Sequence, residues 1–245
     1  MKIIKLDAIN STNEYLKQYV KENSITNTCI SYTFNQTKGK GQRGKAWLSE
    51  PDKNIAFSIC LFPENLKVKD QFSINMLFSL FIINTLKSLK IPDLSIKWPN
   101  DILSGGKKIC GILNEIRVKG DKIDNVIIGF GINVNQEKFK NLPNAYSLKL
   151  ITKINYDLEG LVNLIIQSLK RYDYLNPKTL FDFKKLTFNY HKNLYGINKN
   201  NFFLDSHNIK FNGKIISVNK MGIIKIKTAD NSLKNYNFQE IQMIY

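Results

Sequence analysis

Apolar and polar positions alternate with different periods along the chain, and these periods predict its elements. β-rich runs predict strands over residues 1–9, 28–34, 54–62, 94–98, 108–118 and 123–133. A long stretch that is apolar on one broad face predicts a core helix over residues 68–89. Shorter periodic stretches predict further helices over residues 11–21, 157–174 and 178–190.

Local signals mark where some of these elements begin and end. Ser11 and Glu14 have the spacing of a capping box, so we expect the first helix to begin at Ser11. Residues 119–121, Lys-Gly-Asp, lie between two strands and predict a hairpin. Residues 38–46 hold a cluster of glycines that neither a helix nor a strand supports well, which predicts a loop.

From about Leu194 onward, short strand-like pieces alternate with turns. These pieces are HNIKF, GKIISV, GIIKIKT and QEIQMIY. They predict a small all-β unit that follows the first part without a flexible linker. We therefore expect two domains, residues 1–192 and residues 193–245, with an α+β fold in which helices flank a mixed sheet and a β unit follows.

The composition is that of an ordinary soluble globular protein. Of 245 residues, 43% are hydrophobic and 23% are charged, which suits one large domain with a small appendage. The first residues show no cationic lead followed by a long apolar run, and the most apolar stretch, residues 76–83, is too short to span a membrane. We expect a cytoplasmic protein without a membrane partner.

The net charge and the numbers of cysteines and histidines limit which ligands and which catalytic groups the protein can have. The formal net charge of +16 suggests nucleic acid first, but the lysines are spread along the chain without a dense basic run. Such a diffuse field suits an anionic substrate or an acidic protein partner. The three cysteines have no metal-ligand spacing, and the two histidines come late in the chain. We therefore expect no metal site and no histidine-based triad.

A glycine-rich loop over residues 36–47 is the first of four segments that combine glycines or amides with cationic groups. Its backbone N–H groups, with Lys40, Arg43 and Lys45, are suited to hold phosphate or carboxylate oxygens. The spacing is neither that of a Walker A loop nor that of a Rossmann fingerprint. Taken alone, a basic glycine-rich segment is more often an exposed flexible turn than a binding site.

The other three segments lie at strand ends. KWPND, residues 97–101, places a lysine, an asparagine and an aspartate beside a proline turn. KKICGIL, residues 107–113, has Gly111 inside a strand, which marks either a bulge, a ligand contact or simple packing. GFGINVN, residues 129–135, ends in amides, and Asn133 has the paired donor and acceptor that an adenine edge needs. Taken alone, each of these segments is better explained as an ordinary turn or strand end, and it is their joint presence in this order that favours a functional site.

The order of these segments resembles that of the biotin protein ligase family. The matching segments are Ser11-Thr12-Asn13, Gln36 with GKGQRGKAW, KWPND, KKICGIL and GFGINVN. Lys108 follows the lysine of KWPND by eleven residues, which is specific to the family. The resemblance covers residues 1 to about 190. It implies a class II synthetase-like catalytic domain, a small C-terminal SH3-like β-barrel, and the monofunctional type without an N-terminal DNA-binding domain.

The resemblance also implies roles for individual residues. Biotin would be bound by Ser11, Thr12, Asn13, Gln36, Gly39, Lys40, Gly41, Gln42, Lys108 and Gly111. The nucleotide would be bound by Lys40, Arg43, Lys45, Trp47, Asn100, Lys108 and Asn133. The implied catalytic residues are Lys108, Arg43, Lys97 and Asp101. Of these, Asp101 is the candidate to orient the incoming acceptor lysine.

The implied reaction fits these residue types. Biotin's carboxylate attacks the α-phosphorus of ATP, pyrophosphate leaves and biotinyl-5′-AMP forms. Cations and N–H groups stabilise the developing charge, so no protein nucleophile is needed. Mg²⁺ would accompany ATP, held mostly by phosphates and water. The acceptor would be a lysine of a biotin carboxyl carrier protein domain of a biotin-dependent carboxylase.

One position departs from the family pattern, and several alternatives remain open. Gln42 is neutral where the family's loop often has arginine, so the adenylate is either held less tightly or held well enough by neutral hydrogen bonds. A lipoate–protein ligase and a non-catalytic biotin-binding relative are the alternative functions. A DNA-binding repressor is disfavoured because no recognition helix precedes Ser11. The oligomeric state is also left open, with a homodimer as one alternative.

Overall fold

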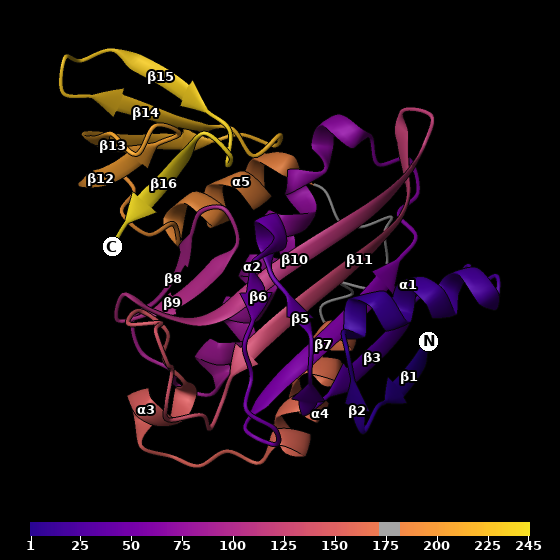
Figure 1. Cartoon of the computed structure of the whole chain (residues 1–245). Coiled ribbons are helices and arrows are strands. Elements are labelled where there is room, and N and C mark those ends of the chain that lie inside the picture. Colours follow the sequence, from indigo (N-terminus) through magenta and orange to yellow (C-terminus); the bar gives the residue numbers. More distant parts are fainter. Residues whose placement is uncertain (172–181) are drawn as a thin grey trace.

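A seven-stranded mixed sheet forms the centre of the computed structural model, which describes residues 1–171 and 182–245 (Figure 1). Its order is β1-β3-β7-β11-β10-β9-β8. The strands are β1 (Lys2–Lys5), β3 (Cys29–Thr33), β7 (Asn54–Leu61), β8 (Leu94–Lys97), β9 (Asp101–Ser104), β10 (Lys107–Lys119) and β11 (Lys122–Asn133). β1 pairs with β3 in parallel and every other neighbouring pair is antiparallel. The predicted α+β class with a mixed sheet is confirmed.

Helices cover the two faces of this sheet (Figure 1). One face carries α1 (Thr12–Glu22), whose Leu16 and Val20 pack on Cys29, Cys60 and Ile127. The other carries α2 (Phe72–Ser88) and α4 (Leu158–Arg171), and α5 (Phe183–Lys192) packs on α2. A short helix, α3 (Leu148–Thr152), follows the connection after β11. Among the described residues, no helix is both long and apolar enough to cross a membrane.

Large and small side chains alternate along β7 and β11, and this alternation makes the two faces different. The large side chains face α2 and form the core: Ile55, Phe57, Ile59, Ile128, Phe130 and Ile132. The small residues face the α1 side: Ala56, Ser58, Gly129 and Gly131. Because successive strand residues point to opposite faces, one face is a filled core and the other is a shallow floor.

A second, antiparallel sheet has the order β15-β14-β13-β12-β16 and lies beside α5 and the β8–β9 hairpin (Figure 1). Its strands are β12 (Asn200–Asp205), β13 (Lys210–Val218), β14 (Ile224–Thr228), β15 (Leu233–Tyr236) and β16 (Ile241–Ile244). This five-stranded unit fits the predicted SH3-like arrangement. Phe203 and Ile215 of this sheet belong to the same apolar cluster as the core of the large sheet, so the two sheets share one hydrophobic core.

The structure corrects several predicted elements. The strand expected over residues 1–9 is two strands, β1 and β2 (Ala8–Ile9). The expected loop at residues 38–46 contains a 3-10 turn (Gln42–Gly44) and a short ladder of β5 (Gly39–Lys40) with β6 (Ala46–Trp47). The short β4 (Asn35–Gln36), β9, α3, β12 and β15 were not predicted, and the predicted pieces HNIKF and GKIISV overlap a single strand, β13. The predicted helix end at residue 174 and helix start at residue 178 lie outside the described residues.

Candidate active site

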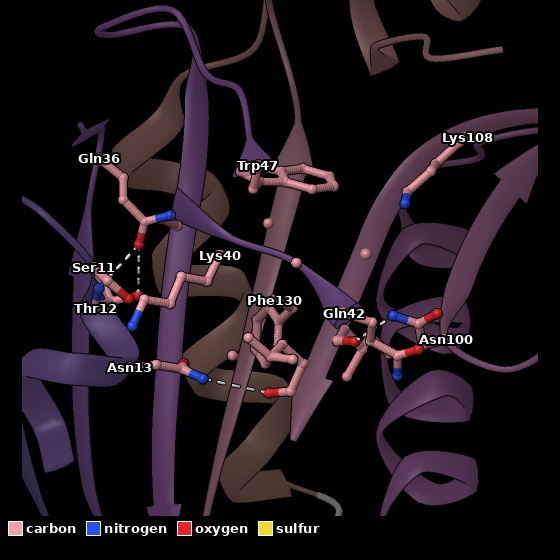
Figure 2. A pocket seen from close by; sticks show the side chains of 17 residues that line it. Ser11, Thr12, Asn13, Gln36, Lys40, Gln42, Trp47, Asn100, Lys108 and Phe130 are labelled. Atoms are coloured by element: carbon pink, nitrogen blue, oxygen red, sulfur yellow. Dashed lines mark hydrogen bonds between the residues drawn. The ribbon is translucent and has the colours of Figure 1, made fainter. Parts of the chain in front are cut away.

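The start of α1 presents polar side chains that are buried without a ligand. Ser11 caps the helix, since its Oγ accepts from the backbone N–H of Glu14 at 3.4 Å. Thr12 donates from its backbone N and from Oγ1 to Oε1 of Gln36, at 2.9 Å and 3.2 Å. Ser11, Thr12 and Asn13 are each at most 5% exposed. The helix start and Gln36 of β4 therefore form one preorganised polar wall (Figure 2).

Two residues that the sequence analysis missed hold this wall in place. The Ser58 hydroxyl lies 2.7 Å from Thr12 Oγ1 and 2.6 Å from Asn13 Oδ1, and donates to one of them at a time. Asn13 Nδ2 donates to Glu115 Oε2 at 2.8 Å. These bonds fix which way the Asn13 amide points. The alternation of large and small residues in β7 is the sequence signal that could have found Ser58.

Trp47 lies flat on a floor made of glycine backbone. Gly111 of β10 pairs directly with Gly131 of β11. A Cβ built on Gly131 would be 2.4 Å from Trp47 Cε2, and one on Gly111 would be 2.9 Å from Trp47 Cζ3. Only glycine allows the indole to approach this closely. Gly111 and Gly131 therefore contact the loop's own tryptophan in this structure.

Sheet register brings the KWPND residues onto the same floor. Gly131 pairs with Ala56 on one side and with Gly111 on the other, Gly111 pairs with Asp101, and Asp101 pairs with Lys97. Residues paired in register share a face. Asp101 and Lys97 therefore stand on the face that carries α1 and Trp47, at the end of a row that begins with small residues.

A β-bulge turns Lys108 into the site. The β9–β10 register shifts between Lys108, which pairs with Leu103, and Cys110, which pairs with Ile102. The extra residue, Ile109, reverses the alternation, so Lys108 shares the face of Asp101 although it precedes Gly111 by three positions. Lys108 Nζ lies 2.6 Å from Asp101 Oδ1 and 5.4 Å from the centre of a Trp47 ring.

Lys97 is the more buried of the two site lysines. Its Nζ lies 4.0 Å from Asp101 Oδ2 and 4.0 Å from the ring centre of Tyr245. Burial lowers the pKa of Lys97 to about 8; the Asp101 carboxylate opposes the shift, and the positive charges of Lys108 and Lys45 add to it. Two ammonium groups thus share one carboxylate, which leaves positive charge available for an anion.

The asparagines of the site are anchored to backbone. Asn100 Nδ2 donates to the carbonyl of Ile112 at 2.7 Å, and the Ile112 N–H donates back to the Asn100 carbonyl at 2.9 Å. Asn133 Nδ2 donates to the Tyr146 carbonyl at 2.9 Å. Each bond uses one of the two N–H donors of its amide group, so each asparagine keeps a second N–H and its Oδ1 atom with which to bind a ligand.

Two adjoining cavities gather the predicted residues. The smaller, of about 60 Å³, is lined by every predicted biotin-binding residue except Gly39. Gly39 instead packs between Gln36 and Trp47. Figure 2 shows Thr12, Asn13 and Gln36 on one side of this cavity, with Lys108 and Asn100 on the other. The larger cavity, of about 420 Å³, is lined by the predicted nucleotide residues Lys45, Trp47, Asn100, Lys108 and Asn133.

Two predicted site residues, Lys40 and Arg43, are not among the buried site groups that the structure describes. Lys40 lines the smaller cavity, where it is exposed and its Nζ pairs with Glu14 Oε1 at 2.8 Å. The side chain of Arg43 lies outside the part of the chain that the structure describes. The predicted catalytic residues Lys97, Asp101 and Lys108 do come together, since all three line the larger cavity.

The second sheet contributes a wall that no local motif indicated. Phe238, Ile241, Met243 and Tyr245 line the larger cavity together with the KWPND residues. Both cavities have Gly41, Gln42, Trp47, Asn100 and Lys108 in their walls. Within residues 1–171 and 182–245, His, Cys, Asp and Glu side chains form no group of three that could hold a metal ion.

Comparisons with known proteins agree with this arrangement. A sequence model of the biotin/lipoate A/B protein ligase family matches residues 6–133. The chain is 28% identical over 242 residues to the bifunctional ligase/repressor BirA of Bacillus spizizenii, covering 96% of this chain and 72% of that protein. It is 24% identical over 181 residues to the biotin–[acetyl-CoA-carboxylase] ligase of Mycobacterium tuberculosis, covering 71% of this chain and 66% of that protein.

A solved structure extends the likeness to the whole chain. The biotin protein ligase from Aquifex aeolicus, solved in complex with biotin and ATP, has a TM-score of 0.78 to this structure. The match covers 99% of this chain and 98% of that one, at 24% identity. This likeness demonstrates a common fold across both sheets.

Proposed function

Because the chain belongs to the biotin/lipoate A/B protein ligase family, we propose that it is an ATP-dependent biotin protein ligase. It activates biotin to biotinyl-5′-AMP and transfers the biotinyl group to a lysine of a biotin carboxyl carrier protein domain. The biotin branch of the family is supported by the relative from Mycobacterium tuberculosis, which is a biotin–[acetyl-CoA-carboxylase] ligase.

The observation that carries this proposal is the pair of adjoining cavities with Lys108 in both walls. The smaller has a preorganised polar wall of Thr12, Asn13 and Gln36, which suits a compact hydrogen-bonding group such as a ureido ring. The larger is cationic and suits the phosphates of MgATP. A carboxylate that extends from the first cavity meets the α-phosphorus of the nucleotide beside Lys108.

The adenylation step follows from these charges. An oxygen of the biotin carboxylate attacks the α-phosphorus, and pyrophosphate leaves with the electron pair of the broken P–O bond. Lys108 and Lys97 stabilise the charge that builds on the phosphoryl oxygens. In the ligand-free protein Asp101 holds both ammonium groups in position. Mg²⁺ enters as part of the MgATP substrate, bound mainly by phosphate and water oxygens.

Trp47 and its loop control access to the site. The smaller cavity, at about 60 Å³, is well below the roughly 300–1,000 Å³ of ligand pockets. The loop at residues 38–47 therefore moves when biotin enters and closes over the adenylate afterwards. Closure would keep water from hydrolysing the mixed anhydride.

In the transfer step an acceptor lysine attacks the carbonyl carbon of the adenylate, and AMP leaves. A free lysine has a pKa near 10.4, so it loses a proton before it attacks. Asp101 stands in the glycine row next to the reacting centre, and its carboxylate is the group proposed to accept a hydrogen bond from that amine. Asn133 and Trp47 are proposed to contact the adenine.

The test is a direct transfer assay. The protein is incubated with MgATP, biotin and a carrier domain, and the carrier is weighed by mass spectrometry. We expect a gain of one biotinyl group that requires both ATP and biotin. A parallel reaction contains lipoate in place of biotin. Modification by lipoate alone would replace the biotin assignment, and binding of biotin without adenylate or carrier modification would identify a non-catalytic binding protein.

A further inference from the structure

Tyr245 reaches the catalytic lysines from the second sheet. It follows β16, and its ring centre lies 4.0 Å from Lys97 Nζ. Both side chains line the larger cavity. At this distance the ammonium lies against the electron-rich face of the ring, in the geometry of a cation–π contact. A residue far from every motif of the catalytic sheet therefore contacts one of its charged groups.

The position of Tyr245 is fixed by its neighbours. Asn144 Nδ2 donates to the Tyr245 carbonyl at 3.0 Å. The ring of Tyr195 packs edge-on against the Tyr245 ring at 6.2 Å between centres. Tyr195 is in turn tied to β8, because its N–H donates to the Ile96 carbonyl at 2.8 Å. Tyr245 is thus attached to the strand that ends at Lys97, and it is not a loose surface group.

Apart from the Tyr245 ring, the charged groups and the solvent around Lys97 stabilise its ammonium only weakly. Within residues 1–171 and 182–245, the charged groups that act on the Lys97 pKa are the carboxylate of Asp101 in β9 and the ammonium groups of Lys108 in β10 and Lys45 in the loop. Asp101 lies 2.6 Å from Lys108 but 4.0 Å from Lys97, so its carboxylate serves Lys108 first. The Lys97 side chain is only 12% exposed, so water offers little compensation.

We propose that Tyr245 is a positioning residue for adenylation, whose ring face keeps Lys97 charged and aimed into the larger cavity. This inference rests on the proposed function, because it assigns the charged Lys97 to the phosphoryl group of the nucleotide. The second sheet then completes the active site and does more than add stability.

The proposal predicts a shift in pH dependence with a defined sign. Lys97 acts as an ammonium, so its contribution is lost as pH rises through its pKa of about 8. Removing the ring destabilises the ammonium and lowers that pKa further. The alkaline limit of adenylation then moves to lower pH. A phenyl ring keeps the cation–π contact, whereas an aliphatic side chain keeps only the apolar cover.

The experiment compares wild type, Tyr245→Phe and Tyr245→Leu by biotin-dependent ATP–pyrophosphate exchange over a range of pH. We expect the kcat of Tyr245→Phe to stay within about twofold of the wild-type value. The kcat of Tyr245→Leu should fall by about tenfold. The alkaline limit of the pH–activity profile of Tyr245→Leu should also move to lower pH. In a Lys97→Met background, Tyr245→Leu should have no further effect on kcat.

A second measurement is independent of activity. The Lys97 ammonium is titrated by NMR in the ligand-free Phe and Leu variants, with melting temperature as the control for folding. A lower Lys97 pKa in Tyr245→Leu than in Tyr245→Phe supports the proposal. Equal Lys97 titration, or equal kcat of the two variants, overturns it. A wild-type protein without biotin-dependent exchange would instead contradict the proposed function, and the NMR comparison would still decide the role of Tyr245.

Discussion

Lys107 and Lys108 are adjacent on β10 and have different surroundings. Lys107 Nζ donates to the Pro143 carbonyl at 3.1 Å, at the surface. Lys108 lies in both cavities against Asp101, because the bulge at Ile109 turns it inward. The pair therefore offers an active-site lysine and a matched control with the same side chain on the same strand.

Lys108→Met is expected to lose adenylation while keeping much of the biotin binding. Its ammonium acts mainly on the phosphoryl centre, and removing one such group costs on the order of 10²–10³ in kcat. The measurements are ATP–pyrophosphate exchange and calorimetry with biotin. Lys107→Met should match wild type in both. Full exchange activity in Lys108→Met would remove this residue from the site.

Gln42 lines both cavities where the family often has arginine. If a charge-assisted contact to the adenylate is missing, Gln42→Arg should slow the release of biotinyl-5′-AMP by about tenfold or more. The measurement is the dissociation rate of the preformed intermediate. Equal rates would contradict the missing contact and would mean that neutral hydrogen bonds from Gln42 suffice.

The buried Lys97 should lower the stability of the fold. Its pKa is about 8 in the folded protein, against an ordinary value of 10.5, so the folded state disfavours the ammonium. The penalty is complete below pH 8 and disappears as pH rises toward 10.5. Lys97→Met should therefore raise the free energy of unfolding at neutral pH by up to about 3 kcal/mol.

Urea unfolding of wild type and Lys97→Met at several pH values tests the direction in which this stability difference changes with pH. The stability difference should shrink as pH increases from neutral toward the ordinary lysine pKa. A difference that grows with pH would mean that the folded state favours the charged form. Asp101 keeps Lys108 as a partner in this variant, so the carboxylate is not left unpaired.

At the scale of elements, the small face of β7 and β11 creates the site. Ala56, Gly129 and Gly131 leave room above the sheet for Trp47 and for the start of α1. Ser58 in the same row supplies the hydrogen bond that connects β7 to α1. A strand with large residues on both faces would bury more apolar area and leave no cavity.

Ser58→Ala tests this connection between strand and helix. It removes the donor to Thr12 and Asn13, so we expect a rise of about fivefold in the KM for biotin and a loss of about 1 kcal/mol in stability. Ser79→Ala is the matched control, because Ser79 is equally buried and donates to Asn75 Oδ1 at 3.1 Å on the far side of the sheet. The control should lose similar stability without a change in KM. Equal KM values in both variants would contradict the role of Ser58.

At the scale of the whole molecule, the turn at residues 219–222 joins the second sheet to the first. Trp98 Nε1 donates to the Gly222 carbonyl at 3.0 Å. Gly222 has a positive φ of 86°, and a Cβ there would be 2.7 Å from Phe72 Cδ2 at the start of α2. Lys220 Nζ pairs with Asp70 Oδ1 at 2.8 Å beside it. We propose that the domain boundary lies at residues 192–193, although the core is continuous across it.

Trp98→Phe should weaken this connection. It leaves the Gly222 carbonyl without its donor, which costs about 1–3 kcal/mol when the group is buried. Lys220→Met breaks the neighbouring ion pair, in which Lys220 is half-exposed and Asp70 is buried, and should cost a similar amount, about 1–3 kcal/mol, because the Asp70 carboxylate loses this partner. Thermal unfolding by circular dichroism measures both. A larger loss in Lys220→Met than in Trp98→Phe would shift the main connection to the ion pair.

The sequence by itself determined most elements, the α+β class and the segments that line the cavities, because periodicity, capping and loop composition act over a few neighbouring residues. β9 and α3 were missed because their patterns are short, and the turn chemistry of KWPND obscured the strand that begins at Asp101. Only the tertiary structure decided which face each residue takes and what it meets. The bulge that turns Lys108 inward, the packing of Trp47 on Gly131 and the Tyr245 ring over Lys97 depend on strand pairing and sheet docking, which join residues far apart in the chain.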